Sequence, residues 1–338
     1  MRRNVERAKQ ECTTCEVRPL VQTTDWADYL KILFGTFDGR SVGIELSMLP
    51  TTYYLRYEKM LAGAKILEIG EQFRKLRMVK DPYEIARHKE AGLIVSKTQE
   101  AARNACKAGA TECEVAGVMI KVARGRGTEH YSSFYSRSFF FNWFIVASGQ
   151  PGDGSDLWTP STFPVLSGAG TDPAIPYGPG TRVLRPGDMV VADYAVIYKG
   201  YHADHCRSYL VDGTPDGYRW RYESLMRAYH CGIDVLRAGS TAEAVFIAMK
   251  QELAKDGLDK NFCGDGIYYQ SMGHGIGLEL DEPPIFIQGD TAPLEENMVV
   301  SLEAKIIIPG WGAINFEDNF VIKKGPPVNL TPTPHLEF

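Results

Sequence analysis

Two aspartates stand on either side of a predicted β-hairpin near the middle of the chain. Asp193 ends an apolar run over 188–193, a Lys199-Gly200 turn follows, and Asp204 comes eleven positions after Asp193. Neighbouring strands lie about 4.8 Å apart, so a hairpin of this length can bring the two carboxylates together. Buried carboxylates repel each other unless a proton or a cation lies between them. The pair therefore indicates either a solvated turn or half of a cation site.

A second acid pair is built in the same way later in the chain. Glu303 ends a strand predicted over 297–303, and Glu317 lies in a strand predicted over 313–319. Between the two pairs, His274 stands in a Gly-His-Gly step that leaves its imidazole accessible. Four carboxylates and one imidazole suit two divalent ions such as Mn²⁺, Fe²⁺, Co²⁺ or Zn²⁺. Two ions about 3.5–4 Å apart can share a water, lower its pKa and polarise a carbonyl.

Composition limits the class of protein. The 338 residues are 44% hydrophobic and 23% charged, which is ordinary for one large domain or two smaller ones. A net charge of −5 gives no general attraction to nucleic acid or to an anionic membrane. No window approaches the roughly 20 apolar residues of a membrane span, and residues 1–7 do not open a secretory signal. We therefore expect a cytoplasmic protein with neither nucleic acid nor membrane as partner.

The cysteines favour neither a disulfide framework nor a metal cluster. Their number, seven, is odd in a long chain. Cys12 and Cys15 form a lone CxxC without a second ligand pair nearby, so we interpret most cysteines as small packing residues.

Residues 1–78 read as a small α/β unit. Helical spacing covers 5–12, 25–34 and 53–61, and short apolar strands are predicted over 41–46 and 65–69. A linker is predicted over 77–82, where Pro82 suits the first turn of the next helix. The second predicted domain spans 79–338.

The second domain reads as two related halves. A helix over 83–107 precedes a capping box of Thr111 and Glu114 and a helix ending near Gly125. A helix over 222–236 likewise precedes a box of Ser240 and Glu243 and a helix running to 257. Each helix pair is followed by antiparallel strands that carry one acid pair. The pattern predicts an α+β fold with an internal duplication.

An aromatic cluster over 131–144 and a Gly/Pro-rich stretch over 149–180 separate the first helix pair from the first acid pair. They indicate either a core strand followed by a long loop or a functional segment. In the second case, the aromatic rings are candidates to hold a cationic substrate through cation–π contacts.

At these residues the chain resembles the pita-bread metallopeptidases, which include prolidase, aminopeptidase P, methionine aminopeptidase and creatinase. The resemblance extends over nearly the whole chain, including the entry segment 80–85, and the ligand intervals of 11, 70, 29 and 14 residues are similar to those of the prolidase branch. It implies a pita-bread catalytic domain with a pseudo-two-fold repeat, behind a small, truncated creatinase-type α/β domain. It also implies a homodimer and two divalent ions, with Mn²⁺ first and Co²⁺, Fe²⁺ or Zn²⁺ as alternatives. The metal ligands that it implies are Asp193, Asp204, His274, Glu303 and Glu317.

Within that set, the resemblance implies that Asp204 and Glu317 bridge both ions. Glu303, next to a hydroxide held between them, is the implied proton acceptor.

Three positions depart from the family pattern. Asp281 stands where peptidase members have a second histidine, seven residues after the ligand histidine. Tyr177 stands where they have a histidine before the first aspartate. Asn315 stands where prolidase-like members often have arginine, two residues before the last glutamate. Because the missing histidines help to bind peptide and stabilise the tetrahedral intermediate, the departures bear on peptide cleavage rather than on the metal.

Three functions remain open at this point. The first is a dinuclear metallohydrolase resembling Xaa-Pro dipeptidase or aminopeptidase, which cleaves a short peptide or amide by a metal-bridging hydroxide with Glu303 as proton acceptor. The second is a non-peptidase member, similar to creatinase or to dimethylsulfoniopropionate lyase. It would act on a small, cationic metabolite with Asp281 as base and Tyr177 as hydrogen-bond donor. The third is a binding protein on the same fold, which retention of all five ligands disfavours.

Overall fold

The computed structural model describes residues 2–19, 26–129, 132–133, 140–141, 144–152, 168–172, 174, 178–262 and 271–338. The chain divides into two compact units, Met1–Glu71 and Gln72–Phe338. Within the described ranges, no helix is both long and apolar enough to cross a bilayer.

The first unit is a small α/β arrangement, as predicted. Strands β1 (Ser41–Ile44) and β2 (Lys65–Glu68) pair in parallel, with Ser41 opposite Lys65. A parallel pair needs a crossover, and here α3 (Thr51–Met60) lies in the connection, preceded by the short 3₁₀ helix η1 (Leu46–Met48). Helices α1 (Arg2–Glu11) and α2 (Trp26–Phe34) precede the strands. Helix α4 (Gly70–Met78), most of which belongs to the second unit, was not predicted, and its end overlaps the start of the expected linker.

The second unit is built on one antiparallel sheet in the strand order β5-β6-β7-β11-β10-β8-β9, with β12 paired to β11. Two long hairpins form its centre and smaller strands extend its edges. The strands are β5 (Phe144–Gly149), β6 (Met189–Tyr198), β7 (Tyr201–Leu210), β8 (Gly273–Gly275), β9 (Glu282–Ile285), β10 (Val299–Ile308), β11 (Gly312–Val321) and β12 (Val328–Asn329). Two short strands, β3 (Ser132–Ser133) and β4 (Phe140–Phe141), pair separately.

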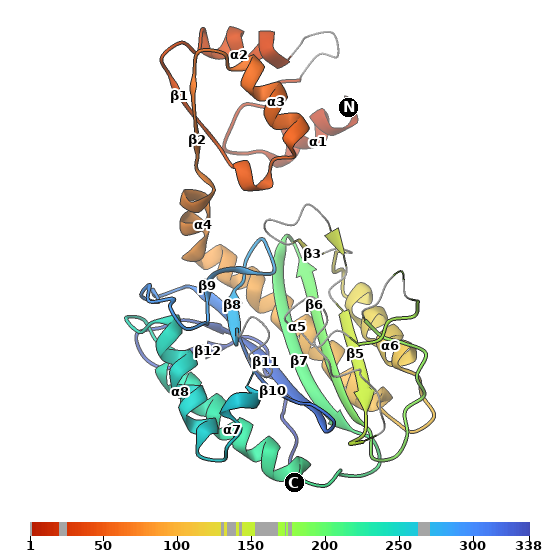
Figure 1. Cartoon of the computed structure of the whole chain (residues 1–338). Helices are drawn as coiled ribbons and strands as arrows, with labels where there is room; N and C mark the ends of the chain where they lie inside the picture. The colour runs from red at the N-terminus through yellow and green to blue at the C-terminus, as the bar shows by residue number, and fades with distance from the viewer. Residues whose placement is uncertain are drawn as a thin grey trace. The chain divides into compact units, whose positions relative to one another are not determined.

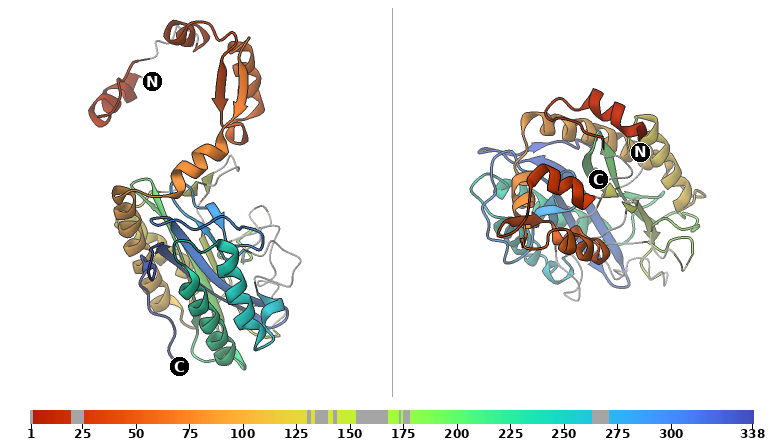
Figure 2. Two further views of the ribbon diagram at one scale, coloured as in Figure 1. Left: turned by 90° about the vertical axis from the view of Figure 1, so that its left-hand side faces the viewer. Right: turned by 90° about the horizontal axis from the view of Figure 1, so that it is seen from above.

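Two helix pairs cover the sheet, one for each half. Helices α5 (Pro82–Ala105) and α6 (Glu112–Gly125) pack on β5, β6 and β7, whereas α7 (Tyr218–Val235) and α8 (Ala242–Ala254) lie side by side next to β10 (Figures 1 and 2). A short 3₁₀ helix, η3 (Asp259–Asn261), follows α8. The predicted duplication of a helix pair with an acid-bearing hairpin is confirmed.

Side chains along β6 and β10 point alternately to the apolar core and to the face that carries the candidate site. Ala192 and Tyr194 of β6 belong to the apolar cluster under α5 and α6, and Leu302 and Ala304 of β10 belong to the cluster under α7 and α8. Because successive side chains of a strand point to opposite faces, Asp193 and Glu303 lie on the face opposite to these apolar residues. The apolar residues that anchor each hairpin thus fix the direction of its acids.

The helix caps show one prediction confirmed and one wrong. Thr111 and Glu114 form the predicted capping box at α6. At α8, however, the cap is Thr241, whose hydroxyl accepts from the Ala244 N–H at 3.0 Å. Ser240 is held outside the helix because its carbonyl accepts from the Leu294 N–H at 2.7 Å. The helix therefore begins one position later than the predicted Ser240–Glu243 box requires.

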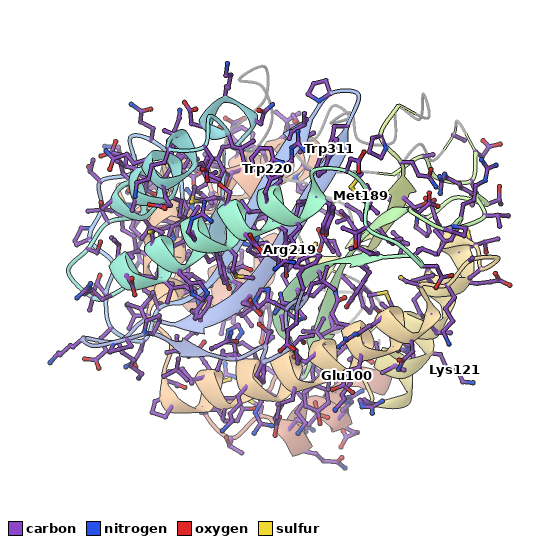
Figure 3. The ribbon with its side chains drawn as sticks, turned by 90° about the horizontal axis from the view of Figure 1, so that it is seen from below. Glu100, Lys121, Met189, Arg219, Trp220 and Trp311 are labelled. Atoms are coloured by element: carbon purple, nitrogen blue, oxygen red, sulfur yellow. The ribbon has the colours of Figure 1, made fainter. Side chains whose placement is uncertain are left out.

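The described surface of this unit carries solvated charges and a cation–π contact of one arginine with two tryptophans. Glu100 of α5 and Lys121 of α6 are exposed and point away from the sheet (Figure 3). The Arg221 guanidinium lies 4.5 Å from the ring centre of Trp220 and 4.4 Å from that of Trp311. This contact ties the start of α7 to the β10–β11 turn (Figure 3).

Candidate metal centre

The first hairpin places its two aspartates on one face of the sheet. Lys199 and Gly200 both have positive φ, 52° and 87°, which is the geometry of a two-residue type I′ turn. In the resulting register Ala195 faces Asp204, so that Asp193, two residues earlier, is the diagonal neighbour of Asp204 on the same face. The two carboxylates are thus neighbours across the hairpin, as the sequence indicated, but diagonal rather than directly opposite.

The second hairpin places its two glutamates directly opposite each other. Glu303 of β10 faces Glu317 of β11, and β11 joins β7 through the pair of Glu317 and Cys206. Cys206 also faces Asp193. The register therefore brings the acids of four strands onto one continuous surface at the centre of the sheet.

His274 reaches this surface from β8, where it pairs with Ser301 of β10. Its flanking glycines are required by close backbone approach. A Cβ at Gly273 would collide with the Ser301 carbonyl, a Cβ at Gly275 would collide with the Pro283 carbonyl, and Gly273 has a φ of 148°. The imidazole Nδ1 lies 3.0 Å from the Gly275 carbonyl. Because a carbonyl can only accept, Nδ1 donates to it, and in that tautomer Nε2 would be the nitrogen that a cation can bind.

Asp204, His274 and Glu317 form a cluster in which one ligand atom of each lies within 4.8 Å of the others. The His274 Nε2 lies 3.9 Å from Asp204 Oδ2 and 3.8 Å from Glu317 Oε1, and all three residues are buried. Burial raises the pKa of Asp204 well above its ordinary value, and repulsion from Glu317 and then Asp193 raises it further. Burial likewise raises the pKa of Glu317, reinforced by Asp193 and Glu303. A divalent cation would relieve this repulsion, so the donor set fits one.

Asp193 and Glu303 lie next to this cluster but outside its three-residue core. Both are buried, 3% and 8% exposed, and both act electrostatically on Asp204 and Glu317. Glu303 has a cation partner already: its Oε2 lies 2.6 Å from the Nζ of Lys305.

Two buried polar side chains support the ligands and were not singled out from the sequence. The Ser301 hydroxyl donates to Glu317 Oε1 at 2.5 Å and accepts from the Asn319 amide at 2.8 Å. The carbonyl oxygen of Asn319 in turn accepts from the Asp204 backbone N–H at 2.9 Å. The available signal was strand alternation, because Ser301 and Asn319 lie two residues from Glu303 and Glu317 and therefore on the same face.

A second network fixes Glu317 from the helix side of the sheet. The Glu317 carbonyl accepts from the His205 imidazole at 2.6 Å and from the Arg207 guanidinium at 2.9 Å. Arg207 also pairs with Asp318 at 2.7 Å, and the Tyr229 hydroxyl of α7 donates to Asp318 at 2.6 Å. The backbone that presents Glu317 is thereby held by buried charges on its far face.

Asp281 stands at the rim of the cluster on a firmly anchored turn. Its Oδ1 lies 3.5 Å from the His274 Nε2, and its side chain is 52% exposed. The next residue, Glu282, is buried and lies 3.3 Å from both Arg77 and Lys80. Asp281 is therefore positioned to meet a molecule that approaches His274 from solvent.

Asn315 and Tyr177 are the other two positions that depart from the family pattern. Asn315 faces Lys305 across the β10–β11 ladder and is buried, and neither polar atom of its amide has a hydrogen-bond partner among the described residues. Tyr177 and most of the aromatic segment 131–144 lie outside the described residues.

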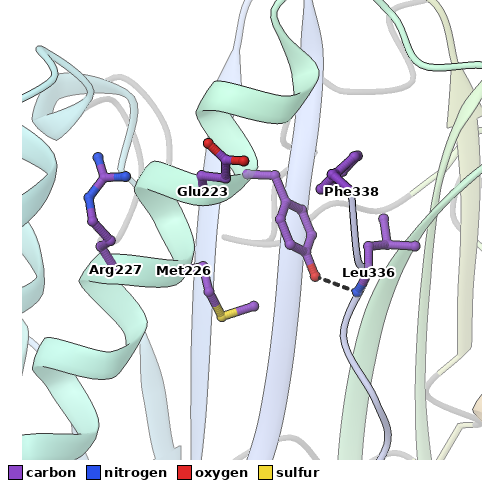
Figure 4. Close-up of a pocket in the computed structure, with 6 residues that line it drawn as sticks. Glu223, Met226, Arg227, Leu336 and Phe338 are labelled. Atoms are coloured by element: carbon purple, nitrogen blue, oxygen red, sulfur yellow. Dashed lines mark hydrogen bonds between the residues drawn. The ribbon is translucent and has the colours of Figure 1, made fainter.

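A surface hollow elsewhere does not contain the candidate ligands. It lies between α7 and the C-terminal segment, where the Leu336 N–H donates to the Tyr222 hydroxyl at 2.9 Å (Figure 4). It is lined by Tyr222, Glu223, Met226, Arg227, Leu336 and Phe338.

Comparison with known families identifies the class. The model of metallopeptidase family M24 matches residues 86–324, and the model of the creatinase/prolidase N-terminal domain matches residues 1–79. The chain therefore belongs to metallopeptidase family M24, with the pita-bread fold behind a creatinase-type N-terminal domain.

Individual relatives are peptidases by name. The chain is 31% identical over 265 residues to the probable dipeptidase PepE of Mycobacterium tuberculosis, which covers 78% of this chain and 60% of PepE. It is 26% identical to the Xaa-Pro dipeptidase of Pyrococcus horikoshii, over 97% of this chain and 81% of that one. The structure of the X-Pro aminopeptidase from Thermotoga maritima superposes with a TM-score of 0.80 and 26% identity, covering 99% of this chain and 85% of that one.

Proposed function

We propose that this protein is a divalent-metal-dependent hydrolase that cleaves a short peptide of the Xaa-Pro type. The observation that carries the proposal is the buried cluster of Asp204, His274 and Glu317, with Asp193 and Glu303 on the same sheet face. The names of the family and of the relatives supply the substrate class.

The proposed ligand roles follow from position. Asp204, His274 and Glu317 would hold one divalent ion, and Asp193 and Glu303 would supply the further ligands that a second ion needs. The proposed metal is Mn²⁺. Bound there, such ions would supply a water of lowered pKa and polarise the substrate carbonyl.

The remaining residues would orient groups and move protons. Glu303 is proposed as the proton acceptor that returns the proton to the leaving amine. Ser301 and Asn319 keep Glu317 and Asp204 in place through hydrogen bonds, and the imidazole keeps its orientation through Gly275. Asp281, exposed beside His274, would contact the substrate.

Metal content and dipeptide turnover test the proposal in order. Purified protein should bind about one or two divalent ions per chain, and the Mn²⁺-loaded enzyme should hydrolyse Ala-Pro or Gly-Pro. Protein that binds less than about one ion per chain after incubation with Mn²⁺ would contradict the proposal.

One observation favours a second candidate function. Asp281 lies within 3.5 Å of His274 where family peptidases keep a histidine, so the rim offers an anionic base instead of an imidazole. A non-peptidase activity on a small cationic metabolite, similar to that of creatinase or the lyase, would use Asp281 in that way. The variant Asp281→His separates the two functions, with Asp281→Asn as control. A gain of dipeptide cleavage in Asp281→His alone supports the peptidase, and no gain supports the second candidate.

The family resemblance further leads us to propose a homodimer, which light scattering on the purified protein would test.

A further inference from the structure

The lysine of β10, Lys305, places a fixed positive charge inside the candidate metal centre. Lys305 lies two residues after Glu303, so both side chains occupy the same face of the strand. The Lys305 Nζ is 2.6 Å from Glu303 Oε2, and the side chains are 2% and 11% exposed. An ion pair this short and this dry is a strong charge-assisted hydrogen bond that salt screens little.

The residue opposite Lys305 on β11 carries no charge that competes with Glu303. Its cross-strand neighbour, Asn315, is buried and uncharged and has no hydrogen-bond partner for its amide in the described part of the chain. The backbone groups of Asn315 are already paired with the Ser208 hydroxyl, 2.9 Å away. Asn315 therefore offers the ammonium no charged partner in place of Glu303.

The three-residue cluster differs from Glu303 in this respect. Asp204 and Glu317 lie within 4 Å of the His274 imidazole, and the ion pairs found between described residues give neither of them a lysine or arginine partner. A cation entering between Asp204, His274 and Glu317 thus meets carboxylates with no directly paired ammonium, although the charge of Lys305 also reaches Glu317. A cation that needs Glu303 meets a carboxylate whose Oε2 is occupied.

We propose that Lys305 is an internal competitor for a divalent cation at Glu303. The inference rests on the proposed metal site and names a regulator of its occupancy. A divalent ion bound to Glu303 would stand beside the Lys305 ammonium, and repulsion between two positive charges in this buried place opposes its binding. The Lys305–Glu303 pair therefore opposes full loading of the centre, and loading should drive the ammonium away from Glu303. Lys305 is a positioning residue that acts on the metal through Glu303.

Metal titration of the full-length, metal-free protein tests the proposal without an activity assay. Lys305→Met keeps the length of the side chain and removes its charge. Mn²⁺ binding, followed by equilibrium dialysis and metal analysis, should show the weaker class of site tightened by about tenfold or more in Lys305→Met. Lys80→Met is the matched control, because Lys80 is equally buried and pairs with Glu282 at 3.3 Å, away from the proposed ligands. It should bind Mn²⁺ as the unchanged protein does.

The outcomes separate this inference from the proposed function. If the unchanged protein binds Mn²⁺ and Lys305→Met binds it equally or more weakly, the competition is wrong and the metal centre stands. If neither protein binds Mn²⁺, both the competition and the metal-dependent function are wrong.

A crystal structure of the unchanged protein with Mn²⁺ gives a test that needs no variant. In it, Nζ of Lys305 should have left Glu303 wherever Glu303 binds the ion. A structure in which the ammonium keeps its hydrogen bond while Glu303 binds Mn²⁺ through the other oxygen overturns the proposal.

Discussion

Arg207 and Asp318 form a buried ion pair directly behind Glu317, with 2.7 Å between Nη2 and Oδ1. Glu317 and Asp318 are consecutive, so one carboxylate faces the candidate metal centre and the other faces the helices. Burial alone would raise the pKa of Asp318, but Arg207, His335 and His205 together lower it. The carboxylate of Asp318 is therefore stabilised by groups on the helix side of the sheet, separately from the acids that face the candidate metal centre.

Breaking this pair should destabilise the protein strongly. Asp318→Asn and Arg207→Met should each lower the free energy of unfolding by about 3–5 kcal/mol, because each leaves a buried charge without its partner. Urea unfolding of the metal-free protein measures the loss. The exposed pair of Arg219 and Glu223 is the control, where Arg219→Met should cost less than about 1 kcal/mol. Equal losses at the two sites would contradict the assignment.

Ser301 should tune metal affinity through Glu317. In Ser301→Ala, Glu317 loses a hydrogen bond of 2.5 Å, so Mn²⁺ affinity should fall by about 10- to 100-fold. Calorimetric titration measures this change. Ser208→Ala is the matched control, because the Ser208 hydroxyl is also buried on the sheet but bonds the backbone of Asn315. A similar loss of affinity in both variants would indicate a general effect of packing.

Asp204→Asn should stabilise the metal-free protein at neutral pH. The pKa of Asp204 is raised in the folded state, so folded protein keeps a proton that unfolded chain releases near its ordinary pKa of about 4. Stability contributed below that pH is therefore lost as the pH rises through the folded pKa. Thermal unfolding between about pH 4 and 8 should show that Asp204→Asn loses less stability with rising pH than the unchanged protein does. Added Mn²⁺ should stabilise the unchanged protein and leave the variant unaffected; the reverse pattern would contradict the site.

His88 should make stability fall in mild acid. It is buried with its Nδ1 2.8 Å from the His202 carbonyl, and burial, with the nearby Lys80, lowers its pKa to about 3. Unfolded chain takes up a proton below about pH 6.5, so stability is lost as the pH falls, by about 1.4 kcal/mol per unit until the folded pKa is reached. In His88→Gln, the free energy of unfolding measured with urea should change less with pH between about pH 6.5 and 4.5 than in the unchanged protein. The exposed His230, changed to Gln, should leave that slope as it is.

Much of the fold was predictable because its signals are local. Strand alternation and the Lys199-Gly200 turn fix the first hairpin, and the cap of Thr111 and Glu114 marks the start of α6. Helix α4 was missed because its apolar positions are few and it lies beside the expected linker. The start of α8 was misplaced because Ser240 and Thr241 are both good caps, and only the backbone bond from Leu294 decides between them.

The candidate site was predictable in its residue types but not in its contacts. Acidic residues at alternating positions of two hairpins predict a cation site, and the three-residue cluster agrees with that prediction. Sequence alone could not reveal that Lys305 pairs with Glu303 or that Arg207 holds the Glu317 carbonyl. The first contact depends on the direction of two side chains on β10. The second depends on the β7–β11 register, which brings together segments far apart in the chain.

The glycines on both sides of His274 have a consequence for reading related sequences. Each lies so close to a neighbouring carbonyl that any side chain would displace the backbone of β8 or its partner strands. This restriction comes from packing and would persist in a copy that had lost its acids or its metal. A Gly-His-Gly step in a distant relative therefore reports that the scaffold has survived, whereas the residues at positions 281, 305 and 315 would report what that scaffold is used for.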